Sequence, residues 1–172
     1  IYDTVLYERR VPKSFNIKAL PFNEKSIIQW KADEKNQGSS TVTNYGDEVI
    51  EQLGLDPLHV FKTLLAQLHD GEVVVAVVPV ASLLNLKALS KAARSKKAKM
   101  AEVAVAERRT GYVAGGISPF GQIREHRTYV DESALLYDEI FVSGGKRGLE
   151  IAISPSIFEV VLGATFAPLS GG

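Results

Sequence analysis

The chain has no cysteine among its 172 residues, and it has only three histidines. Without cysteine there is no disulfide framework, which suits a reducing compartment and predicts a cytoplasmic location. A metal site is not expected, because the sequence offers no cysteine ligand and no His-x-His or HExxH motif. A Walker phosphate loop is missing as well, so we expect a protein that works without a cofactor.

An excess of one charge and long apolar runs are also absent. The 20 basic and 20 acidic residues balance, so the molecule as a whole has no field that would attract nucleic acid. No apolar run reaches the roughly 18 to 20 residues that cross a bilayer, so no membrane partner is expected. The hydrophobic content of 45% and the charged content of 23% are ordinary for a globular protein. The length predicts a single domain over residues 1–172.

Apolar segments separated by turn signals predict the strands. The segment Val60–Leu68 leads through Asp70-Gly71, a hairpin signal, into the continuous apolar run Val73–Pro79, which is typical of a buried central strand. A second pair of strands is predicted over 140–142 and 149–153, joined by a glycine-rich turn. These hairpins lie among helices, so the predicted class is α+β with a mixed sheet.

Three helices are indicated by their end signals. Asn85 predicts the N-cap of the first helix, and a second short helix is predicted over about 103–109. For the last helix, Ser154 is the predicted N-cap and Pro155 the first helical residue, with the helix ending at Gly163.

Two glycine-rich strings, 111–121 and 142–149, are the most informative feature. Adjacent glycines let the main chain approach a ligand closely, because no Cβ intervenes. We therefore expect the amides and carbonyls of both strings to line one pocket. With no cysteine and few histidines, much of the chemistry is expected to come from backbone groups.

Together with the segments 44–48 and 60–65, the two strings resemble the YbaK family of free-standing aminoacyl-tRNA deacylases, which is related to the editing insertion of bacterial prolyl-tRNA synthetases. The resemblance runs from about Thr43 to Leu169, and a segment at about 23–43 looks inserted or divergent. The resemblance implies a strongly curved, barrel-like mixed sheet flanked by helices. It also implies hydrolysis in trans of mischarged tRNA, with Cys-tRNA(Pro) favoured as substrate and prolyl-tRNA synthetase as partner.

Lys62 interrupts the apolar strand and shares a face with Val60 and Leu64. A lysine there is either on the solvated face of an edge strand or a functional group, because desolvating an unpaired ammonium is costly. The resemblance favours the second role and places Lys62 in the substrate pocket. The implied task is to bind the terminal adenosine's sugar or phosphate and place the ester, not to attack it.

The glycine loop is expected to face the aminoacyl group. Gly115 is the expected catalytic backbone position, since preorganised amides can stabilise the oxyanion formed when a carbonyl is attacked. The resemblance assigns substrate contacts to the residues that follow, which are Gly116, Ile117, Ser118 and Pro119. An ordinary β-bulge or turn is the structural alternative.

Three further residues are candidate substrate contacts. Ser143 is not in a Gly-x-Ser-x-Gly elbow, so it is not a predicted nucleophile; it either binds the substrate or satisfies a strand-end backbone group. Glu150 either anchors a substrate amine or hydroxyl or pairs with Lys146 or Arg147 across the hairpin. Tyr45 either borders the pocket, as the resemblance implies, or packs on the core at a helix start.

A local basic patch lies within residues 87–99, which contain six cations and no acid. It is either a solvated helix face or, given the resemblance, a contact for acceptor-stem phosphates. The lysines assigned to this contact are Lys87, Lys91, Lys96 and Lys97. Two other functions stay open: a deacylase for alanine or another small amino acid, and a catalytically silent module that binds tRNA or a synthetase. The oligomeric state, monomer or weak dimer, is left open.

Overall fold

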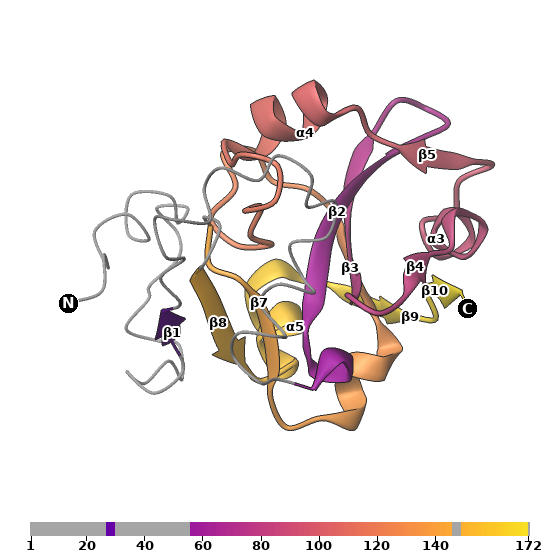
Figure 1. Ribbon diagram of the computed structural model, residues 1–172. Helices are drawn as coiled ribbons and strands as arrows, with labels where there is room; N and C mark the ends of the chain where they lie inside the picture. Colours follow the sequence, from indigo (N-terminus) through magenta and orange to yellow (C-terminus); the bar gives the residue numbers. More distant parts are fainter. Residues whose placement is uncertain (1–26, 30–55, 146–148, 172) are drawn as a thin grey trace.

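The computed structural model describes residues 27–29, 56–145 and 149–171 (Figure 1). The strands are β1 (Ile27–Gln29), β2 (Phe61–Leu68), β3 (Val73–Pro79), β4 (Leu83–Leu84), β5 (Ala98–Met100), β6 (Thr128–Asp131), β7 (Ile140–Ser143), β8 (Leu149–Ile153), β9 (Thr165–Ala167) and β10 (Ser170–Gly171). The helices are α3 (Leu86–Ala92), α4 (Val103–Thr110) and α5 (Ser156–Leu162), with the 3-10 helices η4 (Pro57–His59) and η5 (Glu132–Leu136).

The predicted β2–β3 hairpin is confirmed. The two strands pair in antiparallel fashion from Phe61 opposite Pro79 to Gln67 opposite Val73. The turn contains Gly71 at φ +91°, and the Asp70 carboxylate accepts a hydrogen bond of 3.0 Å from the amide of Glu72. Every residue of β3 is buried, as the continuous apolar run predicted.

A mixed sheet forms the centre of the fold, which confirms the α+β class. Its strand order is β5-β2-β3-β6-β9; β2 pairs in antiparallel fashion with β3 and β5, whereas β3–β6 and β6–β9 are parallel. A three-stranded antiparallel sheet has the order β1-β8-β7, and β10 pairs with β4.

The predicted barrel-like sheet is wrong. Closure of a barrel requires the two edge strands to pair with each other. Among the described strands, the five-stranded sheet instead ends at β5 on one side and at β9 on the other. Neither sheet curls onto itself, because separate layers cover the faces: β7, β8 and α5 on one side of β2 and β3, and α3 with β4 and β10 on the other (Figure 1).

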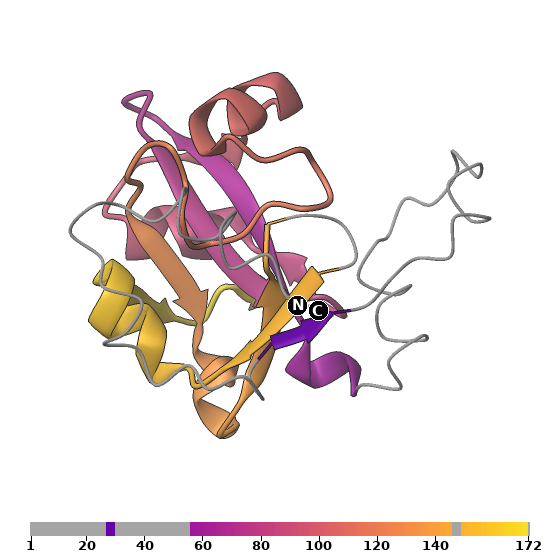
Figure 2. The same ribbon diagram turned by 90° about the vertical axis from the view of Figure 1, so that its left-hand side faces the viewer.

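Two cores result from this layering. One joins alternate residues of β2 and β3 to β7, β8, α4 and α5, with the ring of Phe120 against that of Phe158. The other joins the opposite faces of the same two strands to α3, where Leu89 is fully buried. Figure 2 shows the first side, with β8 and β1 in front and α5 beside them. The strand β3 is buried on both faces because it contributes to both cores.

Asp131 fastens the C-terminal segment to the end of β6. Its carboxylate accepts hydrogen bonds from the amides of Leu169 (2.8 Å), Ser170 (2.7 Å) and Ser133 (3.1 Å). Burial alone would raise the pKa of Asp131, but these bonds and that from the Ser133 hydroxyl outweigh it and lower the pKa. An ionised, fully engaged carboxylate therefore holds β9 and β10 in place.

Helix ends follow the sequence signals with one shift. The Asn85 side chain accepts a 3.0 Å hydrogen bond from the amide of Ala88, so it caps α3 as predicted. Gly163 ends α5 at φ +57°. The assigned helix begins one residue later than predicted, at Ser156, with Pro155 at the N-cap position; Pro155 nevertheless has the helical φ and ψ expected of it.

Candidate functional site

The start of β2 lies against β7, and this contact joins the two hairpins. Val60 and Phe141 form a parallel bridge. Because the two strands run in the same direction, the same step along each leads to Lys62 and Ser143. Ser143 is in turn directly opposite Glu150 in the β7–β8 register. Residues from two distant parts of the sequence, β2 and the β7–β8 hairpin, therefore form one row across neighbouring strands.

None of the three side chains of this row points into the core that includes α4 and α5. Their neighbours in sequence, such as Phe61, Val142 and Ile151, belong to the core that includes α4 and α5. Since side chains alternate along a strand, Lys62, Ser143 and Glu150 point away from this core. The hypothesis that these residues belong to one site is therefore supported by their register.

Lys62 is half-buried, as the interruption of an apolar strand predicted. Its ammonium donates a 3.3 Å hydrogen bond to the carbonyl of Val80, the residue that follows β3. The bond fixes the long side chain across the hairpin, and the ammonium is therefore positioned before any ligand arrives.

Glu150 is the acid of the row, and its pKa is strongly shifted. Its side chain belongs to a residue only 8% exposed, and burial raises the pKa of Glu150 to about 8. A neutral carboxyl group next to Ser143 is a hydrogen-bond donor at pH 7. A substrate ammonium bound there would favour the ionised form. The alternative partners Lys146 and Arg147 lie outside the described residues, so that reading stays a prediction.

The Ser143 hydroxyl organises the second glycine string. It accepts a 3.3 Å hydrogen bond from the amide of Gly145, two residues on. Both roles considered for Ser143 are thus compatible with its place: it satisfies a strand-end amide, and it lies beside Lys62 and Glu150.

The first glycine string forms a tight loop after α4. Gly115 has φ +88°, which a side chain would strain, and it is exposed. The amide of Gly116 donates to the carbonyl of Val113 at 2.9 Å, and the amide of Ala114 donates to the Glu107 carboxylate at 2.9 Å. The amides of Gly115 and Ile117 make no hydrogen bond within the described part of the chain, so they are available to a ligand.

The residues after Gly116 lie deeper. Ile117 packs against the core, and Pro119 is buried. Ser118 is 0% exposed, and its hydroxyl accepts a 3.2 Å hydrogen bond from the amide of Phe120. In this structure the exposed part of the loop runs from Val113 to Gly115, whereas Gly116, Ser118 and Pro119 are buried.

The two glycine strings lie in contact, and their lining of one pocket stays a prediction. A Cβ at Gly145, which has φ +113°, would lie 2.8 Å from Cε1 of Tyr112. The Tyr112 hydroxyl donates a 2.6 Å hydrogen bond to the carbonyl of Phe120 and so spans the first loop. Tyr112 therefore fixes the first loop against the end of β7, two residues beyond Ser143.

The assigned basic residues form a separate surface. Lys87 and Lys91 lie one helical turn apart on α3, and Lys96 and Lys97 follow in the segment before β5; all four are exposed. The helix α3 covers the same face of β2 on which Lys62 lies, further along the strand. The patch and Lys62 are thus on one side of the five-stranded sheet.

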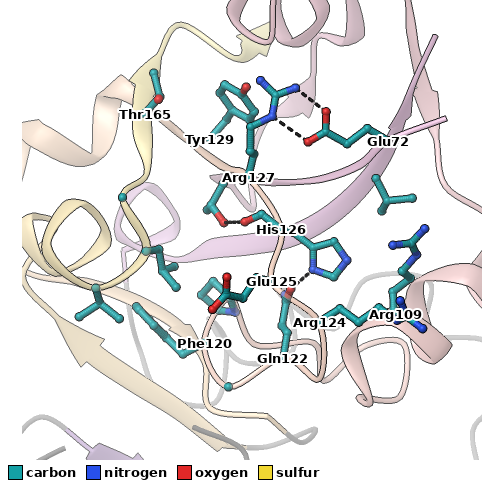
Figure 3. Close-up of a pocket in the computed structure, with 17 residues that line it drawn as sticks. Glu72, Arg109, Phe120, Gln122, Arg124, Glu125, His126, Arg127, Tyr129 and Thr165 are labelled. Atoms are coloured by element: carbon teal, nitrogen blue, oxygen red, sulfur yellow. Dashed lines mark hydrogen bonds and ion pairs between the residues drawn. The ribbon is translucent and has the colours of Figure 1, made fainter. Parts of the chain in front are cut away.

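Sequence reasoning missed a polar cavity of about 600 Å³ on the other side of the first loop (Figure 3). Pro119, Phe120 and Gly121 form one wall, and Arg109, Arg124, His126 and Arg127 lie around it. One signal was present: arginines lie just before Gly111 and just after Gly121.

Three further expectations concern metal ligands, membrane-spanning helices, and residues outside the described part of the chain. Among the described side chains, no group of three or more His, Cys, Asp or Glu is placed to hold a metal ion. None of the described helices has the length and apolarity to cross a membrane. Tyr45 and all of the segment 23–43 except residues 27–29 lie outside the described residues, so the calls on them stay predictions.

Comparison with known proteins identifies the class. Residues 41–158 match the family described as aminoacyl-tRNA editing domain. A protein of Enterococcus faecalis named "Putative Cys-tRNA(Pro)/Cys-tRNA(Cys) deacylase EbsC" is 38% identical over 124 residues, which are 72% of this chain and 76% of the relative.

Solved structures agree on the fold. One, titled "Crystal structure of a putative trans-editing enzyme for prolyl tRNA synthetase", superposes with a TM-score of 0.71 at 21% identity, over 85% of this chain and 86% of that one. Another, titled "Crystal structure of hypothetical protein APE2540", has a TM-score of 0.73 at 22% identity, over 84% and 90%. At these identities the likeness shows the fold alone.

The chain belongs to the aminoacyl-tRNA editing domain family. The resemblance seen in its glycine strings is therefore confirmed. The family assignment also supports the expected enzyme class, an aminoacyl-tRNA deacylase.

Proposed function

We propose that the chain hydrolyses, in trans, the ester that joins a wrongly attached amino acid to the 3′ end of tRNA, with Cys-tRNA(Pro) as the main substrate. The observation that carries this proposal is the row of Lys62, Ser143 and Glu150 beside the junction of the two glycine strings. The name of the 38% identical relative supports the choice of amino acid.

The residues of the row have positioning roles in this proposal. Lys62, held to the Val80 carbonyl, contacts the sugar or phosphate of the terminal adenosine and places the ester. Ser143 and Glu150 bind the α-amino group of the substrate. When the substrate binds, the buried carboxyl group of Glu150 loses its proton and forms an ion pair with the substrate ammonium. None of the three is a nucleophile.

The chemical step needs only water and the substrate. Water adds to the ester carbonyl carbon, the bond to the ribose oxygen breaks, and that oxygen leaves as the hydroxyl of the tRNA. The amides of Gly115 and Ile117 are the candidate donors to the oxyanion, because they are not used within the loop. The substrate's own thiol assists cleavage in this proposal, as the family resemblance implies. Positioning of an already activated ester supplies much of the remaining barrier reduction.

The exposed lysines of α3 and the following segment contact phosphates of the acceptor stem. These lysines share a side of the sheet with Lys62, so one bound tRNA can contact both the lysines and Lys62. Such contacts position the RNA without reading its sequence. Prolyl-tRNA synthetase is the proposed protein partner, since it produces the mischarged substrate.

A substrate panel tests the proposal. The full chain is incubated with Cys-tRNA(Pro), Ala-tRNA(Pro) and Pro-tRNA(Pro), and release of each amino acid is followed over time. We expect fast hydrolysis of the cysteinyl ester and none of the prolyl ester. Faster release of alanine would redirect the assignment to a small-amino-acid deacylase. Binding without any hydrolysis would show a silent tRNA-binding module.

A further inference from the structure

The polar cavity behind the first glycine loop has no role in the proposed reaction. Its walls come from four places: the β2–β3 turn, the end of α4, the segment from Pro119 to Tyr129, and the end of α5. Pro119 and Phe120 belong to the same loop as Gly115, but Gly115 and the residues of the row do not line the cavity. The cavity is therefore adjacent to the proposed hydrolytic site and separate from it.

Two arginines are held side by side at this cavity. The amide of Arg124 donates to the carbonyl of Arg109 at 3.3 Å, and the preceding amide of Ile123 donates to the carbonyl of Thr110 at 3.0 Å. These bonds fasten the segment after the glycine loop to the last turn of α4. Neither arginine forms an ion pair with another described residue, so both charges are available.

The remaining charges at the cavity largely cancel. Arg127 donates two hydrogen bonds to the carboxylate of Glu72, at 2.7 and 2.6 Å, and this pair is self-contained. Glu125 is the other acid at the wall. With His126 neutral, the charges of Arg109, Arg124 and Glu125 leave an excess of one positive charge at the cavity. Figure 3 shows the Arg127–Glu72 pair on one side of His126 and Arg109 on the other.

The protonation of His126 is fixed by its neighbour. The Gln122 amide nitrogen donates to the carbonyl of Ser118 at 2.9 Å, which leaves the amide oxygen of Gln122 facing Nδ1 of His126 at 2.8 Å. Nδ1 therefore carries the proton, and neutral Nε2 is an acceptor. Nε2 is buried and has no hydrogen-bond partner among the described residues. Burial first, and then the charges of Arg109 and Arg124, lower the pKa of His126, against an opposing contribution from the Arg124 backbone.

We propose that this cavity is a phosphate-binding site, in which Arg109, Arg124 and a protonated His126 hold one phosphate group. The two guanidinium groups supply charge-assisted donors, and the bound anion allows Nε2 to take up a proton from solvent and become a third donor. A buried nitrogen without a partner and two unpaired arginines then all find partners in one ligand. The phosphate comes either from the tRNA backbone or from a small phosphate ester.

The test follows the imidazole of His126 by NMR in the full-length chain, with the signal assigned from a His126→Gln variant. The probes are inorganic phosphate, adenosine monophosphate and an acceptor-stem RNA minihelix. Each phosphate that binds should raise the pKa of His126. In the Arg109→Gln/Arg124→Gln variant binding should weaken about tenfold or more, as for loss of charge-assisted hydrogen bonds. Arg108→Gln, an exposed arginine in the same turn that does not line the cavity, should leave binding unchanged.

The outcomes separate the sources and can overturn the proposal. An effect of the minihelix at lower concentration than that of either small probe assigns the site to RNA; the reverse assigns it to a small phosphate ester. No change at His126 with any probe overturns the proposal, as does an unchanged response in the double variant. If the double variant does not fold, the single Arg124→Gln change at an exposed residue gives the same reading. Because the signal does not depend on hydrolysis, failure of the proposed deacylase activity would leave this result interpretable.

Discussion

The row on the strands and the cavity behind the first glycine loop are both polar, but they are built differently. In the row, one cation and one neutral carboxyl group are held by strand register among apolar neighbours. In the cavity, three arginines, a histidine and two acids are held by loop hydrogen bonds. Strand register holds side chains in a fixed geometry, and such a geometry is suited to positioning the ester bond of a substrate. The excess positive charge of the cavity suits an anion whose position need not be as tightly fixed.

A large effect is expected when the loop between these two regions is altered. A Gly115→Ala change adds a methyl group at φ +88°, at a backbone cost of about 1 kcal/mol. We expect hydrolysis of Cys-tRNA(Pro) to fall about tenfold or more, because a small displacement of oxyanion donors is costly in rate. Rates and thermal unfolding of the same preparation provide the measurement.

Gly163→Ala is the matched control for Gly115→Ala. Gly163 also has positive φ, at +57°, and a Cβ there meets nothing within 4 Å. Its substitution should lower stability by a similar amount and leave hydrolysis intact. Equal losses of activity in both variants would mean that the loop acts only through stability.

A smaller effect is expected from the basic patch. In a Lys87→Gln/Lys91→Gln variant, tRNA binding should weaken about threefold to tenfold, and the slope of log affinity against log salt should decrease by about 2. The maximal rate of hydrolysis should not change, because the row is intact. A salt titration of tRNA binding measures this, with Arg108→Gln as a control on α4. An unchanged slope would make the patch a solvated helix face.

The next effect concerns stability and not catalysis. The pKa of Glu150 is raised by burial from 4.5 to about 8, so its neutral form favours the fold below pH 4.5. That contribution is lost as the pH rises towards 8, because the buried group must then ionise. In a Glu150→Gln variant this pH-dependent loss should be absent, a difference on the order of 1 to 3 kcal/mol. Denaturant unfolding of both proteins at about pH 5 and pH 8 checks it; parallel behaviour would contradict burial of the carboxyl group.

Local patterns predicted most of the secondary structure, because their causes are local. The continuous apolar run 73–79 indicated a strand buried on both faces, and Asn85 and Gly163 marked helix ends through bonds within a few residues. The pairing of Lys62, Ser143 and Glu150 was only implied by resemblance. Their meeting depends on the Val60–Phe141 bridge between distant segments, which no local pattern encodes.

Two features were not predictable for related reasons. Whether a curved sheet closes depends on which strands find each other at its edges, and here β5 and β9 remain separate. The cavity depends on four separate segments, since the chain after Gly121 returns to the end of α4 and brings Arg124 against Arg109. In the sequence these arginines are 15 positions apart and look like ordinary surface charges.

The central claim is that the row on β2, β7 and β8 is the hydrolytic site, and single-turnover hydrolysis of Cys-tRNA(Pro) by a Lys62→Met variant tests it most directly. Methionine keeps the length of the side chain and removes the ammonium that donates to the Val80 carbonyl. We expect the rate at saturating enzyme to fall about a hundredfold or more, as for loss of a placed charge in a catalytic site. Lys99→Met, on the exposed strand β5, should retain the full rate. Full activity in a folded Lys62→Met protein would contradict the claim and place the chemistry elsewhere.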